Sequence, residues 1–162
     1  LNLDNENISG VIDAVEYIAN LRQASNKDEL MVGKNIVVIG GGMTAIDIAV
    51  QSKLLGAEQV TIAYRRSKNI MAASEYEQAL AKKHDVQIQY NVSPKRLLSA
   101  DSNVTAMEFD IMQSQNDGSL IASGENITLK ADVIFKAIGQ KLVTEGLIEN
   151  NSLQLKKGRI VV

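Results

Sequence analysis

The chain has 162 residues, of which 45% are hydrophobic and 22% are charged, and its formal net charge is −2. This length fits one domain that buries a substantial core. The small net charge gives no reason to expect nucleic acid or an anionic membrane as a partner, and no apolar run approaches the length of a membrane span. The chain has no cysteine, which excludes disulfides, thiolate nucleophiles and iron–sulfur ligation within it and fits a cytoplasmic protein.

The first predicted element is a helix. Apolar residues recur at helical spacing from Val11 to Leu21, and Ser9 stands where an N-cap would be. A polar connection over residues 23–29 follows, and a buried strand begins after Gly33. We therefore expect an amphipathic helix before the first strand.

A glycine-rich turn follows that strand. Residues 35–39 are mostly β-branched and run directly into Gly40, Gly41 and Gly42, after which a helical pattern begins. This turn matches G-x-G-x-x-A, the dinucleotide-binding fingerprint, and it lies between a strand and a helix as that motif requires. Gly40 allows a tight turn, Gly42 lets a pyrophosphate approach the backbone, and Ala45 lets the helix lie close to the strand. The free amides and the positive end of the helix would then face the phosphates.

Helices and strands alternate after the turn. In order, we expect a helix over 44–55 ending at Gly56, a strand over 60–64, a helix over 74–83 and a strand over 86–90. A β-α-β-α-β order predicts a parallel, right-handed, doubly wound sheet.

The pattern changes beyond Pro94. Residues 104–113 alternate between apolar and polar, the turn sequence Asn116-Asp117-Gly118 follows, and residues 127–129 read as a returning strand. These features predict an antiparallel meander in place of the next crossover helix. A further buried strand is expected over 131–138.

Two arginines follow the second strand of the fingerprint unit. Arg65 and Arg66 stand where an NAD-preferring site has an acidic residue for the ribose hydroxyls. Adjacent guanidiniums suit a 2′-phosphate, because their planar charged donors match its oxygens, and Lys68 adds a further positive charge. The alternative is that the pair consists of ordinary surface charges after a strand. The pair favours NADPH and leaves NADH open.

Several linked motifs resemble those of one flavoprotein family. They are Gly40-Gly41-Gly42-x-Thr44-Ala45-x-Asp47, Gly56-Ala57, Val60-Thr61-x-x-Tyr64-Arg65-Arg66, Met71-Ala72-Ala73 with Glu75, and Asp132-Val133-Ile134 leading to Ala137-Ile138-Gly139-Gln140. Over roughly residues 8–162 the chain resembles the NAD(P)H-binding domain of the family of the glutamate synthase small subunit and dihydropyrimidine dehydrogenase. The resemblance implies an α/β fold of the Rossmann-like, three-layer ββα FAD/NAD(P)-binding type, with a parallel sheet and an antiparallel β-meander.

The resemblance also implies which residues bind the cofactor. At the positions that match the family's motifs these are Gly40, Gly41, Gly42, Met43, Thr44, Arg65, Arg66 and Gly139. The turn and Thr44 would contact the pyrophosphate, the arginines would hold the 2′-phosphate, and Gly139 would pass close to the ribose or nicotinamide. The chain departs from the family's pattern at Met43, Ile70 and Ala72, where Asp or Asn, a third arginine and proline are usual. No catalytic residue is assigned, and one histidine without cysteine predicts no metal site.

In that family the nicotinamide domain is inserted into an FAD domain. The resemblance implies that residues 34–140 form the NAD(P)H-binding domain, while residues 1–33 and 141–162 border the FAD domain. Because the chain begins with Leu1 and has no second fingerprint, we expect it to be part of a longer polypeptide that carries FAD. The implied reaction is hydride transfer from NADPH to FAD, with electrons passing on to iron–sulfur centres or a catalytic partner subunit. The alternative is a non-catalytic module that binds or senses a dinucleotide without turnover.

Overall fold

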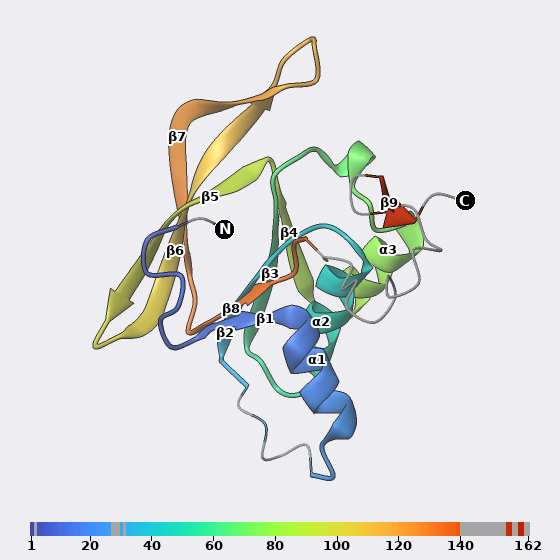
Figure 1. Ribbon diagram of the computed structural model, residues 1–162, viewed down its shortest axis with the longest axis vertical. Coiled ribbons are helices and arrows are strands. Elements are labelled where there is room, and N and C mark those ends of the chain that lie inside the picture. Colours follow the sequence, from blue (N-terminus) through green and yellow to red (C-terminus); the bar gives the residue numbers. More distant parts are fainter. Residues whose placement is uncertain (2, 27–29, 31, 140–154, 157–158, 161–162) are drawn as a thin grey trace.

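The computed structural model describes residues 1, 3–26, 30, 32–139, 155–156 and 159–160. Its centre is a five-stranded sheet in the order β1-β8-β2-β3-β4, in which every neighbouring pair is parallel (Figure 1). The strands are β1 (Val11–Asp13), β2 (Asn35–Ile39), β3 (Gln59–Tyr64), β4 (Val86–Tyr90) and β8 (Val133–Lys136). The predicted parallel sheet is confirmed.

Helices and a second sheet complete the described fold. The helices are α1 (Ala14–Gln23), α2 (Met43–Leu54) and α3 (Glu75–Lys83), with the short 3-10 helix η2 (Lys68–Ile70) before α3. The second sheet is antiparallel and consists of β5 (Val92–Ala100), β6 (Asn103–Ser114) and β7 (Leu120–Lys130). A two-stranded ribbon pairs β9 (Leu155–Lys156) with β10 (Arg159–Ile160). The predicted meander is confirmed, since β5–β7 connect β4 to β8.

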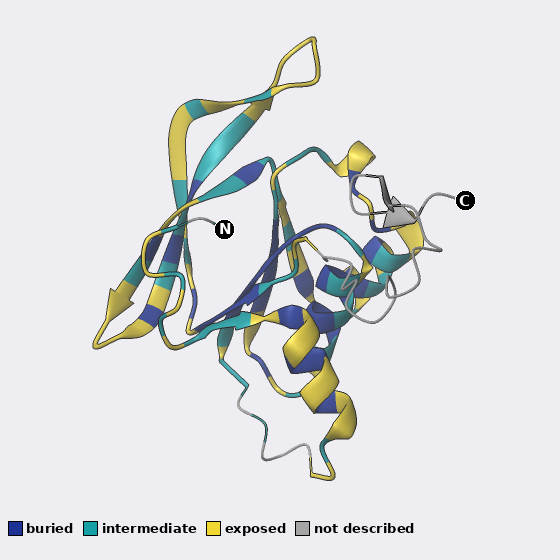
Figure 2. Cartoon of the chain, in the orientation of Figure 1, coloured by how far each residue is buried: buried dark blue, intermediate teal, exposed yellow. Residues whose placement is uncertain are grey.

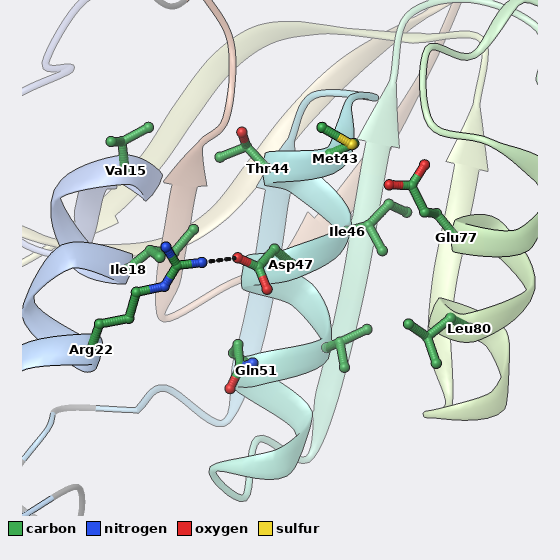
Figure 3. A pocket seen from close by; sticks show the side chains of 11 residues that line it. Val15, Ile18, Arg22, Met43, Thr44, Ile46, Asp47, Gln51, Glu77 and Leu80 are labelled. Carbon is green, nitrogen blue, oxygen red and sulfur yellow. Dashed lines mark hydrogen bonds and ion pairs between the residues drawn. The ribbon is translucent and has the colours of Figure 1, made fainter.

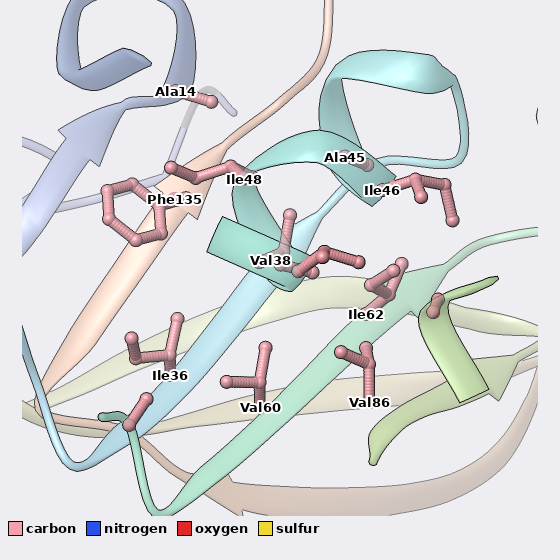
Figure 4. Packing of buried hydrophobic residues seen from close by; sticks show 14 of the residues in the cluster. Ala14, Ile36, Val38, Ala45, Ile46, Ile48, Val60, Ile62, Val86 and Phe135 are labelled. Atoms are coloured by element: carbon pink, nitrogen blue, oxygen red, sulfur yellow. The ribbon is translucent and has the colours of Figure 1, made fainter. Parts of the chain in front are cut away.

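The parallel sheet is buried on both faces, and alternation along β2 shows how. Ile36 and Val38 belong to the apolar cluster formed with the helices (Figure 4). Val37 and Ile39 belong to a second cluster, which includes Met107 and other residues of the antiparallel sheet. Buried residues accordingly follow the central strands in Figure 2. The three layers are therefore helices, parallel sheet and antiparallel sheet, as the ββα fold class predicts. The predicted doubly wound arrangement is wrong, because the described helices cover one face of the parallel sheet and the antiparallel sheet covers the other.

The start of the chain corrects one prediction. A helix is present as predicted, but its expected start at Val11 with Ser9 as N-cap is wrong, because Val11–Asp13 form strand β1, which pairs with β8. Helix α1 begins only at Ala14, and its N-cap is Asp13, whose carboxylate accepts hydrogen bonds from two amides of the first turn, at 2.9 and 3.2 Å. A three-residue strand is too short to show its own periodicity. Its pairing with a strand more than a hundred residues away decides it.

The later elements follow the prediction more closely. Strand β4 has the expected bounds, and α2 and α3 each begin within one residue of theirs. Strand β5 was not predicted, because Pro94 and two charged residues interrupt its pattern and its register shifts between Pro94 and Arg96. Among the described residues, no helix is long and apolar enough to cross a membrane.

Candidate functional site

A pocket of about 460 Å³ lies at the carboxyl ends of β2, β3 and β8. The glycine turn, the loop after β3, the start of β5 and the segment after β8 form its walls. The lining residues are 39–42, 63–66, 72, 92–94, 138–139 and Leu1. Ligand sites in parallel α/β sheets form at this end of the strands, and the volume is that of a small-molecule site. The pocket is therefore the candidate functional site.

The three glycines of the turn are required for different reasons. A Cβ at Gly40, which has φ +153°, would overlap the carbonyl oxygen of Ala137, and a Cβ at Gly41 would overlap the ring of Tyr64. A Cβ at Gly42 would meet no atom within 4 Å, although Gly42 lines the pocket. The chain itself therefore needs glycine at the first two positions. At Gly42 the missing side chain leaves open space over the backbone, which is what a closely approaching ligand requires.

Helix α2 begins at this turn without a side-chain cap. Its N-cap is Gly42, which makes no side-chain hydrogen bond, and its first turn has no acidic residue. The amides at a helix N-terminus have no intrahelical acceptor, and the helix dipole makes this end positive. Ala45 is completely buried against the sheet, as predicted from the motif. The turn can therefore bind an anion through its free backbone amides and the positive end of the helix dipole.

The two arginines lie in the same pocket. Arg65 is exposed and Arg66 is half-buried, and the backbone oxygen of Arg66 accepts a hydrogen bond from the amide of Asn91 at 3.2 Å. Within the part of the chain that the structure describes, neither guanidinium has an ion-pair partner, whereas Arg96 pairs with Glu108 at 2.7 Å. The pocket therefore carries two positive charges that the described residues leave uncompensated. Lys68 lies in η2 and is not part of the pocket lining.

The structure brings six of the eight predicted residues together. Gly40, Gly41, Gly42, Arg65, Arg66 and Gly139 all line the pocket. Thr44 instead shares a neighbouring hollow of about 370 Å³ with Gly139 and Lys136. Met43 points into solvent and lines, with Thr44, a groove between the three helices, where Arg22 and Asp47 pair at 3.4 Å (Figure 3). Contact of Met43 and Thr44 with a cofactor stays a prediction.

Lys136, which lines the neighbouring hollow, forms an ion pair of its own. Its Nζ lies 3.1 Å from the carboxylate of Glu6. Lys136 therefore already has an anionic partner. The uncompensated positive charge at the carboxyl end of the sheet comes from the two arginines instead.

Sequence reasoning missed several residues that shape the pocket. Tyr64 forms one wall, and its hydroxyl donates to the carbonyl oxygen of Ile70 at 2.9 Å. Val92, Ser93 and Pro94 form another wall at the start of β5. The position of Tyr64 at the end of a strand beside the arginines was a usable signal. The start of β5 had none, because its place depends on pairing with β6.

Comparisons with known proteins identify the family. The family model described as pyridine nucleotide-disulphide oxidoreductase matches residues 3–162. The chain belongs to this family. Because the chain has no cysteine, this family member does not carry a redox disulfide within these residues.

Two curated relatives of this pyridine nucleotide-disulphide oxidoreductase chain are named for NADPH. The glutamate synthase [NADPH] small chain of Escherichia coli is 31% identical over 176 residues, covering 98% of this chain and 37% of the relative. The NADPH-Fe(3+) oxidoreductase subunit beta of Geobacter sulfurreducens is 32% identical over 149 residues, covering 88% of this chain and 22% of the relative. The chain thus spans less than two fifths of either relative.

Solved structures support the fold. Mycobacterium tuberculosis FprA in complex with NADPH matches with a TM-score of 0.69 and 17% identity, covering 90% of this chain and 48% of that one. Thioredoxin reductase of T. acidophilum matches with a TM-score of 0.65 and 18% identity, covering 88% and 40%. The chain therefore shares the fold of these two reductases.

Proposed function

We propose that this chain is the NAD(P)H-binding domain of a cytoplasmic, flavin-dependent oxidoreductase similar to the glutamate synthase small subunit, and that it prefers NADPH. One observation carries the proposal. An uncapped helix N-terminus at Gly42, open to the pocket, lies in the same pocket as two guanidiniums without a partner among the described residues. A dinucleotide with a 2′-phosphate presents anionic groups suited to both features.

The residues present fit the dinucleotide. The space above Gly42 lets a pyrophosphate approach the first amides of α2, and no carboxylate of the first turn opposes it. Arg65 and Arg66 supply charged planar donors for the 2′-phosphate. Gly139, with φ +70° and open space around it, lets a ribose or nicotinamide lie against the backbone.

The chain's part in the reaction is binding and orientation. When bound, NADPH supplies a hydride, and in this proposal FAD held by another domain of the same polypeptide accepts it. The protein contributes by holding the dinucleotide in one position, which removes much of the entropic cost of bringing two reactants together. Relatives of more than twice this length support the presence of further domains.

The domain boundaries are part of the same proposal. Residues 34–140 would hold the dinucleotide, while residues 1–33 and 141–162 would border the FAD domain. Residues 140–154 lie outside the described part of the chain. A further electron acceptor, such as an iron–sulfur centre or a partner subunit, would lie beyond this chain.

Titration of the chain with NADPH and NADH tests the proposal. We expect NADPH to bind more tightly than NADH, and replacing both Arg65 and Arg66 by alanine to weaken NADPH binding about tenfold or more, because each charge-assisted hydrogen bond contributes about 1.5–3 kcal/mol. NADH affinity should change less than about twofold. Arg96→Ala is the matched control, since Arg96 already pairs with Glu108 and lies outside the pocket lining. An unchanged ratio of the two affinities in the double variant would contradict the assignment.

A further inference from the structure

A buried glutamine behind the pocket has both ends of its side-chain amide engaged. Gln78 lies on α3 and is only 5% exposed. Its Nε2 donates to the carbonyl oxygen of Ala73 at 2.9 Å, and its Oε1 accepts a hydrogen bond from the hydroxyl of Tyr90 at 2.9 Å. Burying an amide is costly unless it is hydrogen-bonded, so this side chain is held in one orientation.

Ala73, which accepts the hydrogen bond from Gln78, connects the loop that carries the arginines to the glycine turn. Ala73 is 2% exposed, and its amide donates to the carbonyl oxygen of Gly41 at 2.9 Å. The glycine turn therefore holds the N–H of Ala73, while Gln78 holds its C=O. Ala72, the residue before it, lines the pocket. We call residues 65–74 the arginine loop. Its far end is thus fixed directly to the glycine turn.

The near end of the arginine loop is fixed to the sheet. The amide of Asn91 donates to the carbonyl oxygen of Arg66 at 3.2 Å, and the hydroxyl of Tyr64 donates to that of Ile70 at 2.9 Å. Tyr64 and Tyr90 are partners in the register of β3 and β4. Hydrogen bonds therefore fix the loop that carries the arginines at both ends: to Asn91 and the end of β3 at the near end, and to the glycine turn at the far end.

This arrangement suggests a role for Gln78 that rests on the proposed function. We propose that Gln78, oriented by Tyr90, is a positioning residue that sets the placement of Arg65 and Arg66 relative to the glycine turn, and so determines the preference for NADPH over NADH. The pyrophosphate and the 2′-phosphate of one molecule are separated by a fixed covalent framework. Donors for both groups act together only when the protein holds them at the matching separation.

The state of Tyr90 agrees with this role. Burial raises the pKa of Tyr90 above its ordinary value. A tyrosine hydroxyl is already protonated in the neutral range, and the shift keeps that of Tyr90 a donor to Gln78 at higher pH as well. The amide of Gln78 then presents its other end, the Nε2 donor, to Ala73.

The test compares the two affinities in variants that leave the pocket lining intact. Gln78→Met keeps the approximate length of the side chain and removes both hydrogen bonds, and Tyr90→Phe removes only the hydroxyl. We expect the ratio of NADPH to NADH affinity to fall about fivefold in the first variant and about twofold in the second, with NADH affinity nearly unchanged. Gln87→Met is the matched control, because Gln87 lies exposed on β4. A purely structural role would lower the melting temperature and leave the ratio at its wild-type value.

A combined variant separates failure of this inference from failure of the proposed function. In the Arg65→Ala, Arg66→Ala background, Gln78→Met should change the ratio no further, because no guanidinium is left to position. If the arginine substitutions alone leave the ratio unchanged, the proposed NADPH preference is wrong. If they lower it while folded Gln78→Met keeps the wild-type ratio, the role of Gln78 is overturned. Should Gln78→Met not fold, an unchanged ratio in Tyr90→Phe overturns it instead.

Discussion

The glycine turn after β2 and the arginine loop after β3 occupy equivalent places in successive β–α units, yet different forces shape them. The chain's own atoms crowd the turn, with the carbonyl of Ala137 against Gly40 and the ring of Tyr64 against Gly41. The arginine loop instead presents two charges that no described residue neutralises. The fold thus requires glycine at Gly40 and Gly41, whereas only a ligand gives the charges a partner. Substitutions can separate these two requirements.

The largest effect is expected at Gly40. In Gly40→Ala the new methyl group meets the backbone oxygen of Ala137. This backbone cannot move aside cheaply, because the amide of Ala137 donates to the carbonyl oxygen of Ile39 at 2.8 Å. We expect the free energy of unfolding to fall by about 3 kcal/mol or more, as measured by urea denaturation. Gly56→Ala is the control, because Gly56 has φ +104° but open space around it. Its cost should be limited to backbone strain of about 1 kcal/mol. Equal losses in the two variants would contradict the steric explanation.

Gly42→Ala should weaken binding of the dinucleotide while leaving the stability of the fold nearly unchanged. Its Cβ meets nothing in the chain and its φ of −101° suits any residue, so we expect the free energy of unfolding to change by less than about 1 kcal/mol. The methyl group would occupy space that the proposal gives to the pyrophosphate. NADPH and NADH should therefore both bind about tenfold more weakly, with their ratio unchanged, in calorimetric titrations. Wild-type affinity for both would show that Gly42 does not face the ligand.

The far end of the arginine loop offers a smaller test. Ser74 caps α3, with its Oγ accepting from the amide of Glu77 at 3.2 Å while the carboxylate of Glu77 accepts from the amide of Ser74 at 2.7 Å. Ser74→Ala should lower the free energy of unfolding by about 1 kcal/mol. Both affinities should persist, because the backbone bond between Ala73 and Gly41 is retained. Ser67→Ala is the control, since Ser67 precedes η2 without a capping hydrogen bond. A loss as large in the control would refute the capping role.

The smallest expected effect is that of salt. The Debye length falls from about 10 Å at 0.1 M to about 3 Å at 1 M ionic strength, so exposed charges are increasingly screened. Raising the salt concentration over this range should weaken NADPH binding a few-fold more than NADH binding, because only NADPH carries a group for the arginines. The affinity ratio in the Arg65→Ala, Arg66→Ala variant should not respond to salt. A wild-type ratio that is independent of salt would argue against a charged contact.

Much of the fold could be predicted because its signals are local. The β-branched run before Gly40, the helical pattern after it and the turn sequence Asn116-Asp117-Gly118 each depend on neighbours in the chain. Strands β1 and β5 could not be predicted in this way. Strand β1 is three residues long and depends on β8, and β5 is interrupted by Pro94 and paired through a register shift with β6.

The residues of the candidate site also divide into those that local motifs predict and those that depend on tertiary contacts. Six of the eight predicted residues lie in one pocket, because the fingerprint and the arginines each follow a parallel strand and such strand ends meet. Met43 and Thr44 follow the turn so closely that the motif grouped them with it, but the first turn of α2 directs them elsewhere. Gln78 carried no signal, since its role depends on the carbonyl of Ala73 and the hydroxyl of Tyr90.

The sequence by itself determined the chemistry at the end of each strand: bare backbone after β2, and positive charge after β3. Only the tertiary structure decided what surrounds them. It places Ala137 against Gly40, joins Ala73 to Gly41 and brings the start of β5 to the pocket. The physical reason is that backbone conformation and charge belong to single residues and their neighbours, whereas contacts between distant segments form only when buried strands pair and pack.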